Sequence, residues 1–169
     1  MTKLAVFLGN PGAQYTGTRH NAGFDFCTSL DLSSSWQKKF HGEFFKNGNI
    51  VCLRPQTYMN ESGISVQEAA AFFGVKPQDI LVVHDDIEIP FGTVRMQLGG
   101  GMGGHNGLRS VKTHLNTDMF RRLRLGVGRP QGQMDVASFV LAGFTEEEKK
   151  KLSVFFEEAK KKFDDFCRE

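Results

Sequence analysis

The segment RHNAG, residues 19–23, contains a histidine whose role its neighbours in sequence leave open. An imidazole has an ordinary pKa of about 6.5, so a histidine can take a proton from water at neutral pH. A carboxylate that accepts a hydrogen bond from one ring nitrogen fixes the tautomer and frees the other nitrogen for this task. His20 is therefore a candidate general base. The alternative is a loop histidine with a local hydrogen bond only.

Two apolar runs end in polar residues that are candidate partners for His20. The run LAVFLG is followed directly by Asn10, and the run ILVV is followed by the sequence HDD, which contains Asp85. In open α/β sheets, ligands bind beyond the carboxyl ends of the strands. If both runs are neighbouring strands, Asn10, His20 and an aspartate converge at one edge of the sheet.

The side chains present favour water as the nucleophile of a hydrolase. The sequence has no Gly-x-Ser-x-Gly motif, and no cysteine lies near a histidine in an activating context. Asparagine side chains would then supply neutral donors and acceptors for an oxyanion and for substrate amides. Each of them can instead serve the backbone, for example Asn60 as the cap of a helix that starts at Ser62. The candidates in or beside turns are Asn10, Asn21, Asn60 and Asn106.

The segment LGGGMGGHNGLR, residues 98–109, is unusually rich in glycine. Glycine lets the backbone approach a ligand closely, and it also permits a mobile cover over a site. The segment is not a Walker A loop, because no Gly-Lys-Ser/Thr follows, and it lacks the strand context of a dinucleotide-binding motif. The alternative is a flexible loop that leads into a short helix at residues 105–115.

The apolar pattern predicts strands that alternate with helices. This alternation indicates a single α/β domain over residues 1–169, with a mixed, mostly parallel central β-sheet flanked by helices. The predicted strands are residues 3–9, 79–84, 93–98 and 122–128, with a hairpin at residues 43–55 that turns at Asn47 and Gly48. The predicted helices are residues 22–32, 62–73 and 105–115, and a C-terminal helix that starts with a capping box at Thr145 and Glu148 and continues with an apolar stripe from Leu152 to Phe166.

The composition excludes several classes of protein. The longest apolar runs are far shorter than the roughly 20 residues of a membrane-spanning helix. The N-terminal run leads into NPG without a small-residue cleavage site, which predicts a first strand rather than a signal peptide. The cysteines Cys27, Cys52 and Cys167 are odd in number and widely spaced, which favours reduced thiols in a cytoplasmic protein over disulfides or a zinc site.

The net charge of +2 is unevenly distributed. Residues 90–130 contain seven basic side chains and one acidic side chain, so the remainder of the chain sums to −4. A locally basic stretch in a nearly neutral protein predicts one face for an anionic partner. The alternative is ordinary surface charge.

Four motifs in order identify a resemblance to a known family. The segments FLGNPGAQYTGTRHNAGF, RPQTYMNESG, VVHDDIEIPFG and GGGMGGHNGLRS together resemble bacterial peptidyl-tRNA hydrolase, and the resemblance covers nearly the whole chain. It implies a monomeric, cytoplasmic α/β esterase that needs no metal or cofactor. Its partner would be the acceptor arm and 3′ end of peptidyl-tRNA, with no membrane or DNA partner. The reaction would cleave the ester between the peptide and the tRNA.

The resemblance also implies roles for individual residues. His20 would activate water, Asp85 would orient His20, and Asn10 would complete the catalytic set. Gln97 stands where many members have a lysine or arginine that binds the 5′ phosphate of the tRNA, so this contact would either be weaker here or be taken over by Arg95. The implied substrate-binding residues are Tyr15, Asn21, Met59, Asn60, His105 and Asn106, and the implied tRNA-binding residues are Arg95, Arg109, Lys112 and Arg124.

Two other functions stay open at this point. One is an RNA-binding module that has kept the fold and lost the chemistry, although the polar set expected of the enzyme is complete. The other is a metal-dependent hydrolase. Its ligands would be His20, His84, Asp85 and Asp86, but no HxH or HExxH spacing is present.

Overall fold

A central seven-stranded sheet organises the described part of the chain. The computed structural model describes residues 1–32 and 35–169. The strand order is β2-β3-β4-β1-β5-β7-β6; the four central strands run parallel, and β3 and β6 run antiparallel to their neighbours. The strands are β1 (Lys3–Phe7), β2 (Gln37–Lys39), β3 (Gly42–Asn47), β4 (Ile50–Pro55), β5 (Ile80–Asp86), β6 (Val94–Leu98) and β7 (Arg121–Gly126).

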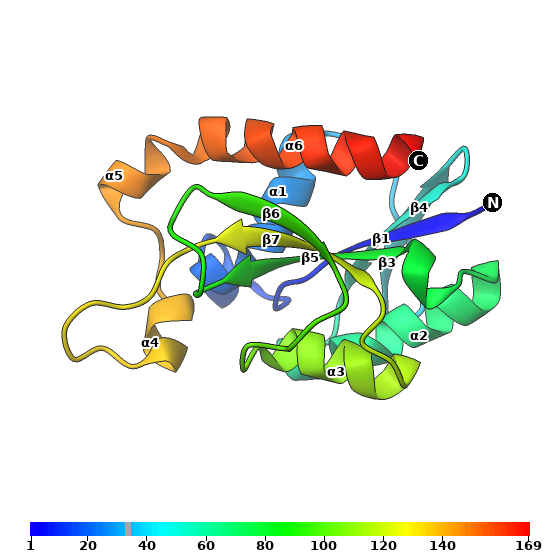
Figure 1. The fold of residues 1–169 in the computed structure, drawn as a ribbon, viewed down its shortest axis with the longest axis horizontal. Coiled ribbons are helices and arrows are strands. Elements are labelled where there is room, and N and C mark those ends of the chain that lie inside the picture. Colours follow the sequence, from blue (N-terminus) through cyan, green and yellow to red (C-terminus); the bar gives the residue numbers. More distant parts are fainter. Residues whose placement is uncertain (33–34) are drawn as a thin grey trace.

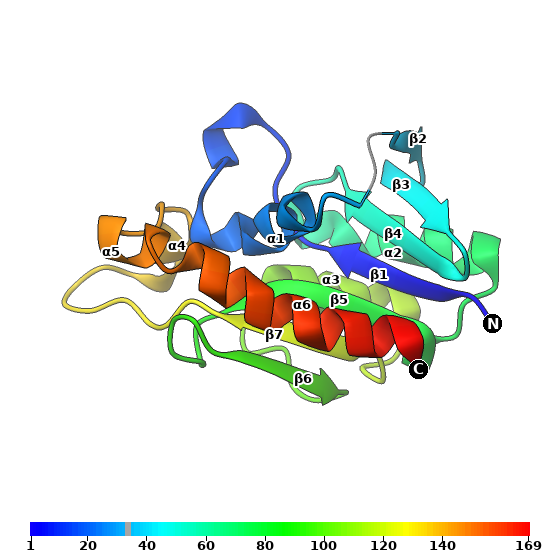
Figure 2. The same cartoon turned by 90° about the horizontal axis from the view of Figure 1, so that it is seen from above.

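Helices cover both faces of the sheet (Figures 1 and 2). One face carries α1 (Ala22–Leu30) and α6 (Leu152–Arg168), and the other carries α2 (Ser62–Phe73) and α3 (Asn106–Leu115). The shorter helices are α4 (Val136–Val140), α5 (Glu146–Lys149), η1 (Ala13–Tyr15), η2 (Arg19–Asn21), η3 (Met59–Glu61) and η4 (Pro77–Asp79). Among the described residues, no helix is long and apolar enough to cross a membrane.

The alternation of side chains along β1 divides the core into two layers. Leu4 and Val6 belong to the cluster that also contains residues of α2 and α3. Ala5 and Phe7 point to the opposite face and join residues of α1 and α6. Because both faces are covered, residues 4–7 of β1 and 80–83 of β5 are apolar without interruption, as the sequence predicts. The predicted fold class, a single α/β domain with a mixed and mostly parallel sheet, is confirmed.

The predicted start of the C-terminal helix is wrong. The capping box of Thr145 and Glu148 is present, but it caps α5, a separate helix of four residues. The long helix α6 begins only at Leu152. Residues 146–151, EEEKKK, have no apolar side chain to bury, so nothing holds them in line with the helix that packs on the sheet. The helix predicted at residues 22–32 also ends earlier, because Asp31 takes a left-handed conformation with φ 48.

Gly23 allows the start of α1 to lie directly on the sheet. A Cβ atom at this position would come within 2.5 Å of the carbonyl oxygen of Leu8 and 2.8 Å of that of Val83. Both contacts are with backbone atoms, one in the middle of β5 and one just after β1, which cannot move aside cheaply. The absence of a side chain at Gly23 therefore lets η2, which carries His20, approach the carboxyl end of β5.

We predict that Gly23→Ala lowers the free energy of unfolding by about 3 kcal/mol, because one of these backbone segments must shift. Urea denaturation measures the loss. Gly143→Ala is the control, because its Cβ would meet only the carbonyl oxygen of Gly17, at an ordinary 3.7 Å. The control should change stability by no more than about 0.5 kcal/mol. Equal losses in both variants would contradict the steric argument.

Candidate active site

A cavity of about 1050 Å³ opens beyond the carboxyl ends of β1 and β5. One side is formed by residues that follow these strands, and another by residues 101–106 of the glycine-rich segment. Gln97, Arg122 and Arg124 contribute from β6 and β7, and apolar residues of α4 close the remaining side. The position matches the general rule for ligand sites in open α/β sheets.

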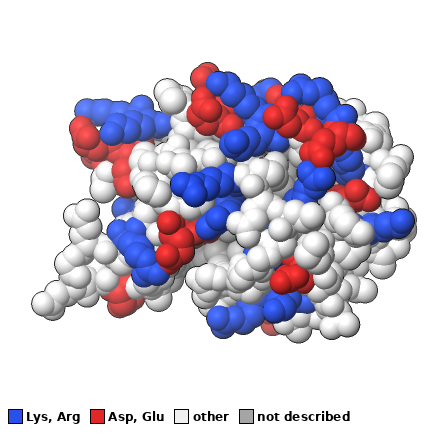
Figure 3. All heavy atoms as spheres, in the orientation of Figure 1, with Lys and Arg blue, Asp and Glu red and all other residues white. Residues whose placement is uncertain are grey.

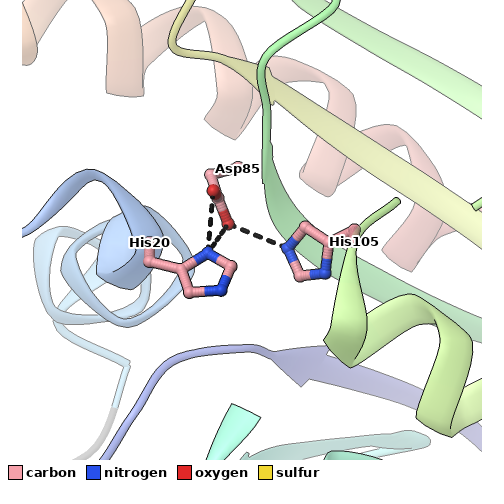
Figure 4. Close-up of side chains that lie close together, drawn as sticks. All are labelled: His20, Asp85 and His105. Atoms are coloured by element: carbon pink, nitrogen blue, oxygen red, sulfur yellow. Dashed lines mark hydrogen bonds and ion pairs between the residues drawn. The ribbon is translucent and has the colours of Figure 1, made fainter. Parts of the chain in front are cut away.

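His20 and Asp85 form a hydrogen-bonded pair inside this cavity (Figure 4). His20 Nδ1 lies 3.0 Å from Asp85 Oδ1 and 2.9 Å from Oδ2, so one N–H donates to both carboxylate oxygens. The other ring nitrogen, Nε2, points away from Asp85 (Figure 4), and no described residue donates a hydrogen bond to it. A neutral His20 in this tautomer therefore presents a lone pair to the cavity, as a general base must.

The electrostatics of the pair favour a charged carboxylate and a basic imidazole. Burial alone would lower the pKa of His20, but the charge of Asp85 and its hydrogen bond outweigh burial, so the pKa of His20 is raised. Burial alone would raise the pKa of Asp85, but the two imidazoles of His20 and His105 hold it well below its usual range. Asp85 is therefore ionised at neutral pH although it is only 2% exposed.

His105 is a second imidazole on the same carboxylate. Its Nε2 lies 2.9 Å from Asp85 Oδ1. Its Nδ1 accepts hydrogen bonds from the backbone N–H groups of Gly107 and Leu108, at 3.1 and 3.3 Å, and so caps the N-terminus of α3. Because Nδ1 accepts hydrogen bonds, the ring proton must be on Nε2, and this N–H donates a hydrogen bond to Asp85.

Asn10 joins the segment that follows β1 to η3. Its Oδ1 accepts a hydrogen bond from the backbone N–H of Met59 at 2.7 Å. Asn21 pairs with the backbone of Asn10, accepting from its N–H at 2.8 Å and donating to its carbonyl oxygen at 3.0 Å. The side-chain oxygen Oδ1 of Asn10 is thus already bonded within the protein. The side-chain N–H groups of Asn10 remain for the cavity that this residue lines.

Comparisons with known proteins agree on one family. A family model described as peptidyl-tRNA hydrolase matches residues 4–169. A peptidyl-tRNA hydrolase from Sulfurovum sp. (strain NBC37-1) is 47% identical over 153 residues, which cover 88% of this chain and 80% of the relative. One from Syntrophotalea carbinolica is 46% identical over 166 residues, covering 94% and 87%. The chain belongs to the peptidyl-tRNA hydrolase family.

The solved structures of this family have the same fold. Peptidyl-tRNA hydrolase from Acinetobacter baumannii superposes with a TM-score of 0.82 at 37% sequence identity. The match covers 92% of this chain and 83% of the other. The resemblance that the four sequence motifs indicate is therefore confirmed across the chain and the fold.

Most residues that the motifs single out line the cavity of this family member, but four do not. Asn21 is buried behind the cavity against Asn10, and Arg95, Arg109 and Lys112 lie outside its lining. The alternative role of Asn60 as a helix cap is wrong, because Glu61 precedes α2 and no side chain caps it. The predicted residues that line the cavity are Asn10, Tyr15, His20, Met59, Asn60, Asp85, His105, Asn106 and Arg124.

Sequence reasoning missed the apolar side of the cavity. Val136, Val140 and Leu141 line it, and Val136 and Leu141 remain 40% and 46% exposed. The run MDVASFVL holds more apolar residues than a surface loop needs, which was the available signal. Arg19, the residue before the candidate base, fixes this side. It donates to the carbonyl oxygen of Phe139 at 3.0 Å and pairs with Glu148 at 3.2 Å.

The basic stretch predicted as one face is largely neutralised in the folded chain. Arg122 is buried, and Arg124 pairs with Asp86 at 2.8 Å. Arg121 and Arg129 pair with Glu169 and Glu88 respectively. In agreement, Figure 3 shows basic side chains interspersed with acidic ones across the visible face. Arg95, Arg109 and Lys112 form no ion pair with any described residue.

The metal-ligand set proposed from sequence does not assemble. Within the described residues, the candidate ligand atoms that meet within 4.8 Å belong to His20, Asp85 and His105, without His84 or Asp86. A histidine that binds a metal through Nε2 carries its proton on Nδ1. At His105 that proton would face the two N–H groups that Nδ1 caps. The cluster therefore does not fit a resident cation.

We predict that Asp85→Asn lowers the pKa of His20, because the neutral amide removes the charge that stabilises the imidazolium while burial still opposes it. The acid form of His20 should therefore appear only at lower pH than in the unmodified protein. Titration of the ring signals by NMR measures the shift. Glu68→Gln is the control, because that carboxylate contacts exposed His41 at 2.7 Å on the other side of the sheet from α1. A His20 titration that does not move in Asp85→Asn would refute the assignment.

Proposed function

We propose that this protein hydrolyses the ester bond of peptidyl-tRNA with water activated by His20. The observation that carries the proposal is the pair of His20 and Asp85, with the free Nε2 of His20 facing an open cavity. As water attacks the ester carbonyl, Nε2 takes its proton and a tetrahedral oxyanion forms. When the carbon–oxygen bond to the ribose breaks, the same proton passes from Nε2 to the leaving oxygen. The products are the free peptide and the tRNA.

Neutral amides would stabilise the oxyanion and hold the peptide. The amide N–H groups of Asn10 face the cavity, and Asn60 and Asn106 lie at its exposed rim. Asparagine donates hydrogen bonds without adding a positive charge that would compete with His20 for Asp85. Tyr15 and Tyr58, whose rings are 6.3 Å apart in an edge arrangement, provide aromatic surfaces for unstacked bases at the 3′ end.

We predict that His20→Ala lowers the rate of peptide release from peptidyl-tRNA by at least about 100-fold, because the base is lost. Asp85→Asn should cost less, since the imidazole stays and only its charge partner changes. Release of labelled peptide under single-turnover conditions measures both rates. Thermal unfolding and tRNA binding should be preserved in His20→Ala. Near-normal release in that variant would rule out the base assignment, and tRNA binding without release in the unmodified protein would favour the RNA-binding module.

Arg124 and Arg95 would bind the phosphates of the acceptor arm. They lie opposite each other in the antiparallel pair of β6 and β7 and therefore share one face. Arg124 donates to Asp86 Oδ2 at 2.8 Å and to the side-chain amide oxygen Oε1 of Gln97 at 2.9 Å, which fixes its orientation. Arg95 is exposed and forms no ion pair with a described residue, so its charge is available. Because Gln97 is neutral and Arg122 is buried, Arg95 supplies the second accessible positive charge of this face.

We predict that Arg95→Gln and Arg124→Gln weaken cleavage of peptidyl-tRNA more than cleavage of a short ester that lacks the tRNA body. Each substitution should also reduce the dependence of binding on salt by about one unit of the log–log slope. Arg168→Gln is the control, because this exposed arginine at the end of α6 pairs with Asp165 and lies outside the cavity lining. Equal losses on both substrates would contradict the phosphate-binding role.

We further propose that the protein acts as a monomer in the cytoplasm. Support comes from a cavity that a single chain lines on all its sides. The three cysteines are free, and Cys27 and Cys52 are buried, which suits a reducing compartment.

A further inference from the structure

We propose that His105 is a positioning residue, which orients Asp85 toward His20 and ties that carboxylate to the N-terminus of α3. This role differs from the contact with substrate that the sequence motifs suggest for His105. It rests on the proposed function, because it concerns the base of that reaction.

Every polar atom of the His105 side chain is already used within the protein. Nε2 donates to Asp85 Oδ1, and Nδ1 accepts from two backbone N–H groups of α3. The side chain is only 9% exposed, which leaves little of it for a substrate. The ring centre lies 4.9 Å from that of His20 and 5.2 Å from that of His84, so two other imidazoles fix its plane.

The N-terminus of α3 fixes which proton His105 carries. The backbone N–H groups of the first turn point at Nδ1, which therefore accepts, and the Nε2–H is directed at Asp85. An N-cap residue usually bonds the helix and nothing else, whereas His105 transmits the constraint to a buried carboxylate.

Asp85 divides its hydrogen-bonding capacity between two donors. Oδ1 accepts from both His20 and His105, and Oδ2 accepts from His20 alone. The second donor prevents rotation of the carboxylate, and it also withdraws negative charge that would otherwise stabilise the imidazolium of His20. Removing the donor should therefore weaken orientation and make His20 more basic.

The charged and titratable groups around this cluster are consistent with a rise in the pKa of His20 when the donor is removed. Burial, followed by the proximity of His105, lowers the pKa of His84 to about 4, so His84 adds no positive charge at neutral pH. Its Nδ1–H donates to the carbonyl oxygen of Asp85 at 2.8 Å. Asp86 and Arg124 neutralise each other in the same cavity. The charged and titratable groups that line the cavity together with His20 and His105 are Tyr15, Tyr58, His84, Asp85, Asp86, Glu88, Arg122 and Arg124.

Hydrogen bonds hold the glycine-rich segment in place on both sides of Met102. At the start, buried Arg122 donates to the carbonyl oxygens of Gly100 and Gly101. At the other end, the backbone N–H of His105 donates to the carbonyl oxygen of Met102 at 3.0 Å. A change in the path of the segment therefore alters the position of His105 and, through it, that of Asp85.

Two substitutions separate the two bonds of His105. His105→Asn keeps an N-cap acceptor for α3, but its shorter side chain no longer reaches Asp85. His105→Gln is long enough to donate to Asp85 but is a poor N-cap. The measurements are the NMR titration of His20 in the free protein, thermal unfolding, and the pH dependence of kcat/KM on peptidyl-tRNA.

We expect His105→Asn to unfold near the temperature of the unmodified protein, to raise the pKa of His20 by at least about 0.5 unit, and to move the acidic limb of kcat/KM upward by the same amount. Its kcat should fall roughly tenfold through lost orientation. His105→Gln should restore the titration of His20 while unfolding at a lower temperature.

An unchanged His20 titration in His105→Asn would overturn the proposal, as would a loss confined to KM, which indicates a substrate contact. An equal loss of stability in both variants, with an unaltered pH profile, would also overturn it, because a structural role explains that result. The titration needs no substrate, so it tests the role of His105 even if the protein fails to cleave peptidyl-tRNA.

Discussion

The carboxylate of Asp85 is almost completely removed from water, and the site is built around this buried charge. An ionised group in such a position is costly unless hydrogen bonds and opposite charge compensate it. Here two imidazole N–H groups bind its oxygens, one from His20 and one from His105. Neither imidazole is close to Asp85 in sequence, so the compensation exists only when the elements that carry them are packed together.

Three features of the fold bring these groups to one place. The parallel pair of β1 and β5 puts their carboxyl ends side by side, with Asp85 at the end of β5. Gly23 lets α1 lie directly on the backbone of both strands. His20 lies in η2, which directly precedes α1. The glycine-rich segment, held by buried Arg122, directs the chain to the N-cap position of α3, which His105 occupies. The geometry of the base thus depends on close backbone packing as much as on side-chain chemistry.

The charge on the surface of the folded chain differs from the charge counted along the sequence. The local sequence between residues 90 and 130 is basic, but the fold places three of its arginines beside acids from other parts of the chain. Arg124 meets Asp86 across β5 and β7, and Arg121 meets Glu169 at the C-terminus. Charge counted along a sequence therefore overestimates a positive surface. Arg95 lies on the edge strand β6, is exposed and has no such partner among the described residues.

The amino-acid sequence was enough to predict the class of fold, every strand except β2 and the identity of the polar groups, because apolar periodicity and short motifs are local properties. The polar strand β2, QKK, has no apolar periodicity to detect. The motifs also identified the family. The sequence could not determine where α6 begins. The capping box is a local signal, whereas the first residue of a long helix depends on which side chains the helix buries. Nor could it distinguish Asn21, which binds the backbone of Asn10, from asparagines that face the cavity. The sharing of Asp85 by two histidines was decided only by the tertiary structure, because hydrogen bonds depend on distances of about 3 Å that sequence spacing does not fix.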